Sequence, residues 1–490
     1  MGAERMWVLL PLLIPLSTAL LTALLRRRTW GRQAVSLIGA GLFLISALVL
    51  LVEVDRVGRL SVALGGWPLP YAIEFAADRL SAAMVLISAV LALAVLFHQA
   101  STADPAPETP ILHPLIHGLL AGFSAACLTA DLFNLYVWFE LMLIAALGLL
   151  VHGGEPRQWD AAFKYLVLNL VGTLLFLAAV AFIYGATGQL NFTALNEAAR
   201  RPELAAALPL YVTLLALAFL LKAGAFPLFA WLPASYHTLP TPVLALFGGL
   251  LTKVGIYALL RLLGQVFAAS PPVLYEALGW LALMTMATGG LGAVYHWDLR
   301  RILAFHIVSQ IGYLLLGIAL ASPAGASATL FFTLHNILAK ANLFLIAGLI
   351  GALAGHYDLR RVGGLYLARP GLAALFLIVA FSLVGLPPSS GFWSKFLLVR
   401  ETFVQERYVW GGVALAASFL TLYSMVKIWL EAFWKPHPED RDLALPVAGL
   451  EPAWLAVLLL AALTLAMGLT PEPFVRYTAA AAASLSGATP

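Results

Sequence analysis

Six ionisable residues interrupt apolar segments of this chain, where charge is costly. Lys222 is the clearest case, because residues 204–252 contain no other charged side chain. A charge at the centre of a membrane segment costs about 2.5–3.5 kcal/mol, and such residues commonly mark ion or proton pathways. The other members of the set are Glu140, Lys253, His335, Lys340 and Lys395. Their types and their spacing predict a path on which protons pass between buried side chains.

The composition predicts a polytopic membrane protein. Of the 490 residues, 62% are hydrophobic and 11% are charged, whereas a soluble domain carries about 25% charged residues. A single soluble core stops growing at about 250–300 residues, so a larger core does not explain this shortage. Most arginines lie in short loops, so the net charge of +4 indicates membrane topology rather than nucleic-acid binding. The single cysteine, Cys127, excludes an internal disulfide and a thiol metal cluster.

The hydropathy pattern predicts about fourteen transmembrane helices, since one span needs about 20 apolar residues. We expect them at residues 6–25, 33–54, 78–100, 111–130, 133–152, 160–185, 206–226, 241–266, 272–295, 300–320, 326–352, 370–399, 409–433 and 450–470. With this count, three arginine-rich loops at residues 26–32, 300–301 and 360–369 fall on one side. The positive-inside rule makes that side cytoplasmic, so both termini are expected outside.

Two of the expected helices are broken by glycine and proline. The seventh contains Gly224 and Pro227, and the twelfth contains Pro387 and Pro388. Proline removes a backbone donor and clashes with the preceding turn. At membrane depth, such a break is tolerated only where it is buried or lines water. Paired breaks in the two halves of a transporter indicate inverted repeats and the position of the ion path.

The expected fold is therefore all-α, with two inverted five-helix repeats that each contain one broken helix. The predicted segments are an N-terminal three-helix segment (1–110), a first repeat of helices four to eight (111–270), a second repeat of helices nine to thirteen (271–435), and a C-terminal helix and tail (436–490).

In the first half, Glu140 and Lys222 are expected on facing helices, within reach of an ion pair or one bridging water. A purely structural ion pair is the alternative, but buried ion pairs are poor stabilisers. Lys253 follows Gly248 and Gly249, and small residues allow another helix to approach closely. The alternative for both lysines is that they extend towards an interface, which their mid-helix positions disfavour.

In the second half, His335 and Lys340 lie on one expected helix, and His306 lies on the helix before it. Histidine titrates near physiological pH and suits a proton relay. His335 and Lys340 diverge by about 140° on a regular helix, and a π-bulge would bring them to one face. For His306, a relay and a structural hydrogen bond are equally open.

The two breaks predict the ends of the path. Lys395 accompanies the second break as Lys222 accompanies the first, so we expect Lys395 to be the terminal proton carrier. His237 follows the first break and is interpreted as a proton entrance. Zinc-type ligand spacing and a phosphate-binding loop are both absent from the sequence. We therefore expect no metal, cofactor or catalytic residue in this chain.

These residues resemble the antiporter-like family shared by respiratory complex I, membrane-bound hydrogenases and Mrp-type multisubunit cation/proton antiporters. The resemblance covers nearly the whole chain and is carried by Phe139-Glu140 and by the runs 222–237, 300–313 and 385–395. Within the family, the chain is most similar to the D subunits of Mrp antiporters. It departs from complex I subunits at Lys395, where a glutamate is usual, and at Gln310, where a histidine is frequent. His306 is expected to replace that histidine.

The resemblance implies a heteromeric complex that exchanges cytoplasmic sodium for external protons across a bacterial or archaeal cytoplasmic membrane. The leading interpretation is a proton-translocating subunit of an Na+/H+ antiporter, a secondary transporter rather than an enzyme. Its expected partners are the other subunits, protons and the lipid bilayer, with Na+ as a further candidate and no nucleic acid. Two alternatives stay open: a proton-pumping subunit of a redox complex of the complex I or hydrogenase type, and a non-conducting membrane scaffold.

Overall fold

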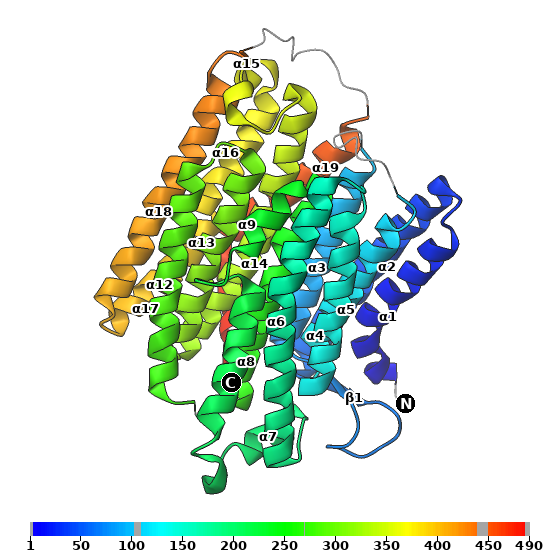
Figure 1. Ribbon diagram of the computed structural model, residues 1–490, viewed down its shortest axis with the longest axis vertical. Coiled ribbons are helices and arrows are strands. Elements are labelled where there is room, and N and C mark those ends of the chain that lie inside the picture. The colour runs from blue at the N-terminus through cyan, green and yellow to red at the C-terminus, as the bar shows by residue number, and fades with distance from the viewer. Residues whose placement is uncertain (1–2, 102–108, 269, 439–448, 486–490) are drawn as a thin grey trace.

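Long helices packed side by side form the molecule, as a computed structural model shows (Figure 1). The structure describes residues 3–101, 109–268, 270–438 and 449–485. The part of the expected tail at residues 439–448 and 486–490 lies outside the described residues. The expected all-α membrane architecture is confirmed, because eleven helices in the described residues are long and apolar enough to cross a membrane.

Each expected transmembrane segment corresponds to one helix of the structure or to two or more helices that follow one another in the chain. Those of the N-terminal segment and the first expected repeat are α1 (Ala3–Leu24), α2 (Thr29–Val57), α3 (Arg79–Gln99), α4 (Leu112–Leu128), α5 (Leu132–Val151), α6 (Pro156–Thr187), α8 (Leu208–Ala223), α9 (Trp231–Ser235), α10 (Thr241–Leu246) and α11 (Thr252–Arg261). Those that follow are α12 (Pro272–Tyr295), α13 (Leu299–Ala319), α14 (Pro323–Ala354), α16 (Pro370–Val384), α17 (Ser390–Val404), α18 (Tyr408–Ile428) and α19 (Glu451–Leu469). Helices α4, α8 and α16 are apolar but shorter than the eleven spanning helices, so the count of fourteen crossings stays a prediction. The two inverted repeats stay a prediction as well.

Several elements were not predicted from the sequence. Strands β1 (Leu60–Ala63) and β2 (Glu74–Ala77) form an antiparallel hairpin in which Leu60 is opposite Ala77. Short helices α7 (Phe192–Ala198) and α15 (Leu365–Ala368) lie at opposite ends of the bundle, and β1 lies at the α7 end (Figure 1). A last helix, α20 (Pro471–Leu485), follows α19. Three segments are π-helical: η3 (Phe247–Leu251), η4 (Leu262–Val266) and η6 (Trp429–Trp434).

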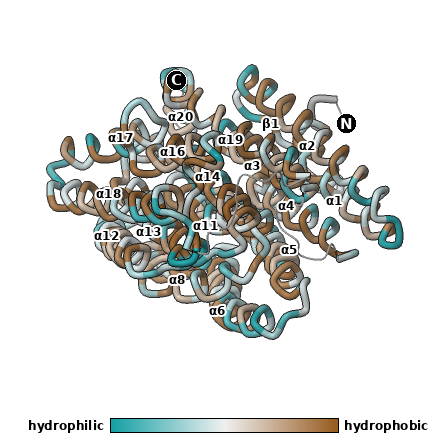
Figure 2. Tube along the Cα trace, turned by 90° about the horizontal axis from the view of Figure 1, so that it is seen from above, coloured by the Kyte–Doolittle hydropathy of each residue, from teal (hydrophilic) through white to brown (hydrophobic). Residues whose placement is uncertain are grey.

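Helices α11, α13 and α14, which carry Lys253, His306, His335 and Lys340, are the most deeply buried ones. In the apolar stretches of α13 and α14, 94% and 89% of the residues are buried, compared with 33% in α1. Seen from above, α11 and α14 lie in the middle of the bundle, whereas α1, α6 and α18 lie at its edge (Figure 2). Lys253 of α11, His306 of α13 and Lys340 of α14 are thus enclosed by protein, while the outer helices present apolar residues.

Both predicted helix breaks are present. Helix α8 ends at Gly224 with φ +79°, and α16 ends at Gly385 with φ +94°. This left-handed conformation favours glycine, because other residues meet a Cβ clash there. At the first break, the Phe226 N–H donates to Thr285 Oγ1 of α12, and the Trp231 indole donates to the Leu221 carbonyl. Side chains thus satisfy backbone groups that the break frees, as burial at membrane depth requires.

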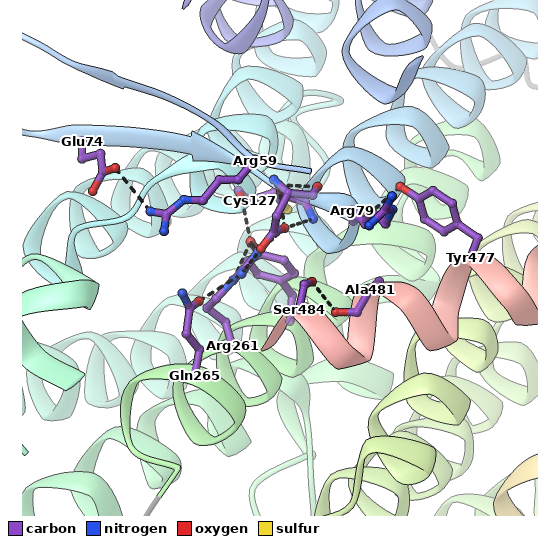
Figure 3. A network of polar contacts seen from close by, with 12 residues as sticks. Arg59, Glu74, Arg79, Cys127, Arg261, Gln265, Tyr477, Ala481 and Ser484 are labelled. Carbon is purple, nitrogen blue, oxygen red and sulfur yellow. Dashed lines mark hydrogen bonds and ion pairs between the residues drawn. The ribbon is translucent and has the colours of Figure 1, made fainter. Parts of the chain in front are cut away.

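A buried ion pair joins the N-terminal segment to α11 near the β-hairpin (Figure 3). Arg261, the last residue of α11, donates two hydrogen bonds to the carboxylate of Asp78, the N-cap residue of α3. Arg261 also donates to the Tyr257 hydroxyl, which donates to the Cys127 carbonyl of α4. Burial alone would raise the pKa of Asp78, but the charge and hydrogen bonds of Arg261 outweigh it and lower this pKa to about 2.

We expect Asp78→Asn to lower the free energy of unfolding by about 3–5 kcal/mol, because the charge of Arg261 would remain buried without its carboxylate. Thermal unfolding of the purified chain in detergent measures the effect. Because the folded pKa of Asp78 is lowered, the pair stabilises the chain above about pH 4, and this stabilisation is lost as the pH falls towards 2. The control is Asp55→Asn, which removes the exposed partner of Arg79 and should cost less than about 1 kcal/mol. Equal losses in the two variants would contradict this role of the buried pair.

Candidate proton path

A threonine hydroxyl connects the two charged residues of the first half. Glu140 lies on α5, Thr173 on α6, and Lys222 at the penultimate position of α8. Thr173 Oγ1 donates to Glu140 Oε1 at 2.7 Å, and Lys222 Nζ donates to Thr173 Oγ1 at 2.9 Å. Side chains of α5 and α8 meet at Phe139 and Phe219. The link between Glu140 and Lys222 runs through a hydroxyl group of α6 rather than through the expected direct ion pair or bridging water.

A small cavity of about 20 Å³ lies beside Lys222, on the side that faces the helix of Lys253. Its lining includes Phe139, Asn169, Lys222 and Val254, the residue after Lys253. A volume of about 10–15 Å³ is enough to hold one water molecule. The cavity therefore offers room for one water beside Lys222, on the side of α11.

Lys253 is fully buried directly after a π-helical segment. Its Nζ donates to the Gly248 carbonyl at 2.6 Å, within η3. π-helical turns are rare and are frequent at functional sites. A Cβ on Gly248 would lie 2.5 Å from Phe344 Cε2 of α14. The glycine thus allows α14 to approach closely, as the small residues before Lys253 predicted.

Lys395 has a similar environment at the second break. Its Nζ donates to the carbonyl of Val384, the last residue of α16, at 2.7 Å. It also donates to Ser418 Oγ of α18 at 3.1 Å, and it lies 4.9 Å from the ring centre of Tyr313. The broken helix therefore supplies the acceptor that holds the buried ammonium group, as η3 does for Lys253.

The two ionisable residues of α14 have separate surroundings. The π-bulge that would bring His335 and Lys340 to one face does not occur, because α14 is a regular α-helix throughout. The structure has a π-helical segment before Lys253 instead. His335 Nδ1 forms a hydrogen bond with Ser390 Oγ, the first residue of α17, at 2.9 Å. Lys340 Nζ is buried without a hydrogen-bond partner among the described residues, and it lies in electrostatic range of Lys253 and Lys395.

Further buried polar side chains lie on α13 and α14 around Lys340, some with hydrogen-bond partners and some without. His306 Nε2 forms a hydrogen bond with Ser424 Oγ of α18 at 2.6 Å. In the described residues, the side-chain polar atoms of Ser309, Gln310 and Asn336 are buried without hydrogen-bond partners. Each such group costs about 1–3 kcal/mol, so their presence beside a buried lysine favours a functional explanation.

His237 lies in η2 (Tyr236–Thr238), directly after α9 and away from this central group. Its Nδ1–H donates to the Pro233 carbonyl at 3.0 Å, and its Nε2 accepts from Arg301 Nη2 at 3.0 Å. Burial and the charge of Arg301 lower the pKa of His237 to about 4. At neutral pH His237 is therefore an uncharged acceptor, and it lines a cavity of about 520 Å³ at the molecular surface.

The structure thus brings Lys253, Lys340 and Lys395 into the bundle centre, and it places Glu140 and Lys222 beside that group. Sequence reasoning missed Thr173 and the serines that bind His306, His335 and Lys395. A signal for Thr173 was available, since it follows Gly172 inside an apolar helix. Among the described residues, no group of three His, Cys, Asp or Glu side chains could hold a metal ion.

Apolar helices that enclose a row of lysines beside two helix breaks define a membrane subunit of the antiporter type. The model for the transmembrane region of the NADH:quinone oxidoreductase/Mrp antiporter family matches residues 129–421, and the chain belongs to this family. The resemblance inferred from the sequence is therefore confirmed.

Individual relatives support the same assignment. The chain is 38% identical over 471 residues to the D subunit of the Na(+)/H(+) antiporter of Alkalihalophilus pseudofirmus, with 96% of this chain and 95% of the relative covered. It is 35% identical over 440 residues to the D subunit of the Na(+)/H(+) antiporter of Bacillus subtilis, with 89% of each covered.

Solved structures resemble the fold over its full length. A chain of the Mrp complex from Dietzia sp. DQ12-45-1b has a TM-score of 0.91 at 30% identity, covering 100% of this chain and 98% of that chain. A chain of respiratory complex I from Thermus thermophilus has a TM-score of 0.85 at 26% identity, covering 98% and 99%.

We expect Lys340→Met to raise the free energy of unfolding by about 1–3 kcal/mol, because it replaces a buried amine without a partner by an apolar side chain of similar length. The midpoint of thermal unfolding in detergent measures this change. The matched control is Lys253→Met, which also removes a hydrogen bond to Gly248 and should be less stabilising. A larger loss of stability in Lys340→Met than in Lys253→Met would mean that Lys340 is held by a partner.

Proposed function

We propose that this chain is the proton-translocating subunit of a multisubunit Na+/H+ antiporter. The observation that carries the proposal is the row of buried lysines that reaches from Lys222 through Lys253 and Lys340 to Lys395. Three of them donate hydrogen bonds to a hydroxyl or backbone carbonyl, and the fourth has no partner in the described residues. Neutral acceptors can hold a lysine in either protonation state, as a proton carrier requires.

The order of the proposed path follows the neighbours of each group. Glu140 and Lys222 exchange charge through Thr173, and the small cavity beside Lys222 leads towards Lys253. Lys340 lies in electrostatic range of Lys253 and Lys395. Like charges at short distance repel, so a proton that arrives on Lys253 favours release from Lys340. His306 and His335 act as relays beside Lys340.

The membrane orientation belongs to the same proposal. The α15 end of the bundle carries the arginine-rich loops, so it faces the cytoplasm and both termini face outward. The repeats comprise residues 111–270 and 271–435, and each contains one break and its lysine. His237 lies at the cytoplasmic end beside the first break, where protons taken up from outside would leave the path rather than enter it. The other subunits of the antiporter complex are the partners, since the relatives are named as subunits.

The function is tested by Lys222→Ala in the assembled complex. We expect the complex to assemble while proton-driven Na+ exchange in everted vesicles falls at least about tenfold, because the first proton carrier is lost. Arg476→Ala is the control, since Arg476 is exposed and pairs with Glu472. Full exchange in Lys222→Ala would refute the path. Loss of assembly would favour the scaffold alternative.

The hydroxyl bridge gives a second prediction. Thr173→Val keeps the side-chain shape but removes both hydrogen bonds to charged groups, which contribute about 1.5–3 kcal/mol each. We expect the exchange rate to fall about tenfold or more and its pH profile to shift. Thr173→Ser retains the hydroxyl and should restore most of the rate and the original profile. If Val and Ser behave alike, Thr173 serves only helix packing.

A further inference from the structure

The cavity at His237 has an unusual lining for a membrane protein surface. It has a volume of about 520 Å³ and lies between α6, the segment after the first break, and the corner between α12 and α13. Three basic side chains line it, Arg157, Lys164 and Arg301, together with one acid, Asp160. Its apolar lining includes Phe229 and Phe305, whose rings pack edge to face at 6.5 Å.

The lining carries an excess of positive charge. Lys164 pairs with Asp160 at 2.5 Å, and Arg157 pairs with Glu155. Arg301 instead donates to His237, which is uncharged at neutral pH. The acid nearest in sequence, Asp298, forms its ion pair with Arg300. A guanidinium group binds a phosphate through two parallel hydrogen bonds, so Arg301 is suited to an anionic phosphodiester.

Exposed aromatic residues place this cavity at the level of the lipid headgroups. Trp159 lies two residues after Arg157 on α6, and Tyr295 and Trp297 flank the α12–α13 corner. All three rings are exposed. Trp and Tyr concentrate where the hydrocarbon region meets water, because their rings are amphipathic.

An apolar stripe leads from the cavity along α6. Phe163, Val167, Leu170 and Leu174 are exposed and are spaced three or four residues apart, so they share one face of the helix. The stripe begins beside Lys164 and continues towards the middle of the expected span. An acyl chain can lie along it, whereas a free phosphate ion would leave it unused.

We propose that this cavity binds the phosphodiester headgroup of an anionic phospholipid, with an acyl chain along the α6 stripe. The basic side chains of the cavity favour an anionic headgroup. The apolar stripe begins beside these side chains, so the site favours a lipid over a soluble anion. Basic pockets at the cytoplasmic end of transmembrane helices commonly bind such headgroups. This proposal concerns binding alone, so it stands or falls independently of the transport proposal.

The test measures lipid binding to the assembled complex after delipidation in detergent. The complex is titrated with phosphatidylglycerol or with phosphatidylcholine, and bound lipid is counted by native mass spectrometry. We expect one phosphatidylglycerol site per chain that is absent with phosphatidylcholine. Arg301→Gln and Lys164→Gln should each weaken binding about fivefold, as the loss of one basic residue near anionic lipid predicts. Arg360→Gln is the matched control, because this exposed arginine at the same end pairs with Asp358 outside the cavity.

Three outcomes would overturn the proposal. The first is equal retention of the two lipids, and the second is unchanged phosphatidylglycerol binding in both cavity variants. The third is complete displacement of phosphatidylglycerol by millimolar inorganic phosphate, which would indicate a site for free anions. If Arg301→Gln fails to fold, Lys164→Gln decides alone, because Lys164 is exposed and forms only an (i, i+4) ion pair on its own helix.

Discussion

An ammonium group inside an apolar bundle is stabilised by an oxygen acceptor, and in a regular helix each interior carbonyl already accepts one backbone hydrogen bond. This chain supplies acceptors by making its helices irregular. Lys395 binds the carbonyl at the end of α16, and Lys253 binds a carbonyl within the π-helical η3. The left-handed glycines and the nearby prolines thus belong to the proposed proton path as much as the lysines do.

The kind of acceptor affects how readily a buried lysine gains or loses its proton. A carboxylate in contact with a lysine would hold its proton, and buried ion pairs also have a high desolvation cost. A hydroxyl or carbonyl is neutral, so it stabilises the ammonium form less and also tolerates the amine. Glu140 is kept one hydroxyl away from Lys222, which retains electrostatic coupling between the two without a direct pair. Thr173 is therefore a sensitive position in the first half of the path.

The sequence predicted the features whose signals are local. Lysines in apolar segments and Gly-Pro breaks stand out in a single chain, so Lys222, Lys253, Lys340 and Lys395 were found together with both breaks. It missed Thr173, because its position after Gly172 in an apolar helix does not show that Glu140 and Lys222 come from two other helices to meet it. It did not predict the π-helical segment before Lys253, since the local helical register depends on packing against neighbours. The β-hairpin escaped notice because its strands have only four residues each.

The hydrogen bond from the Tyr477 hydroxyl of α20 to the Arg79 carbonyl (Figure 3) joins residues that are 398 positions apart. Ribosomes add about 5–20 residues per second, so the start of α3 exists for about 20–80 seconds before its partner is made. The contact between α20 and α3 thus forms only after the helices between them have been made, and the Arg79 carbonyl lacks this hydrogen bond until then.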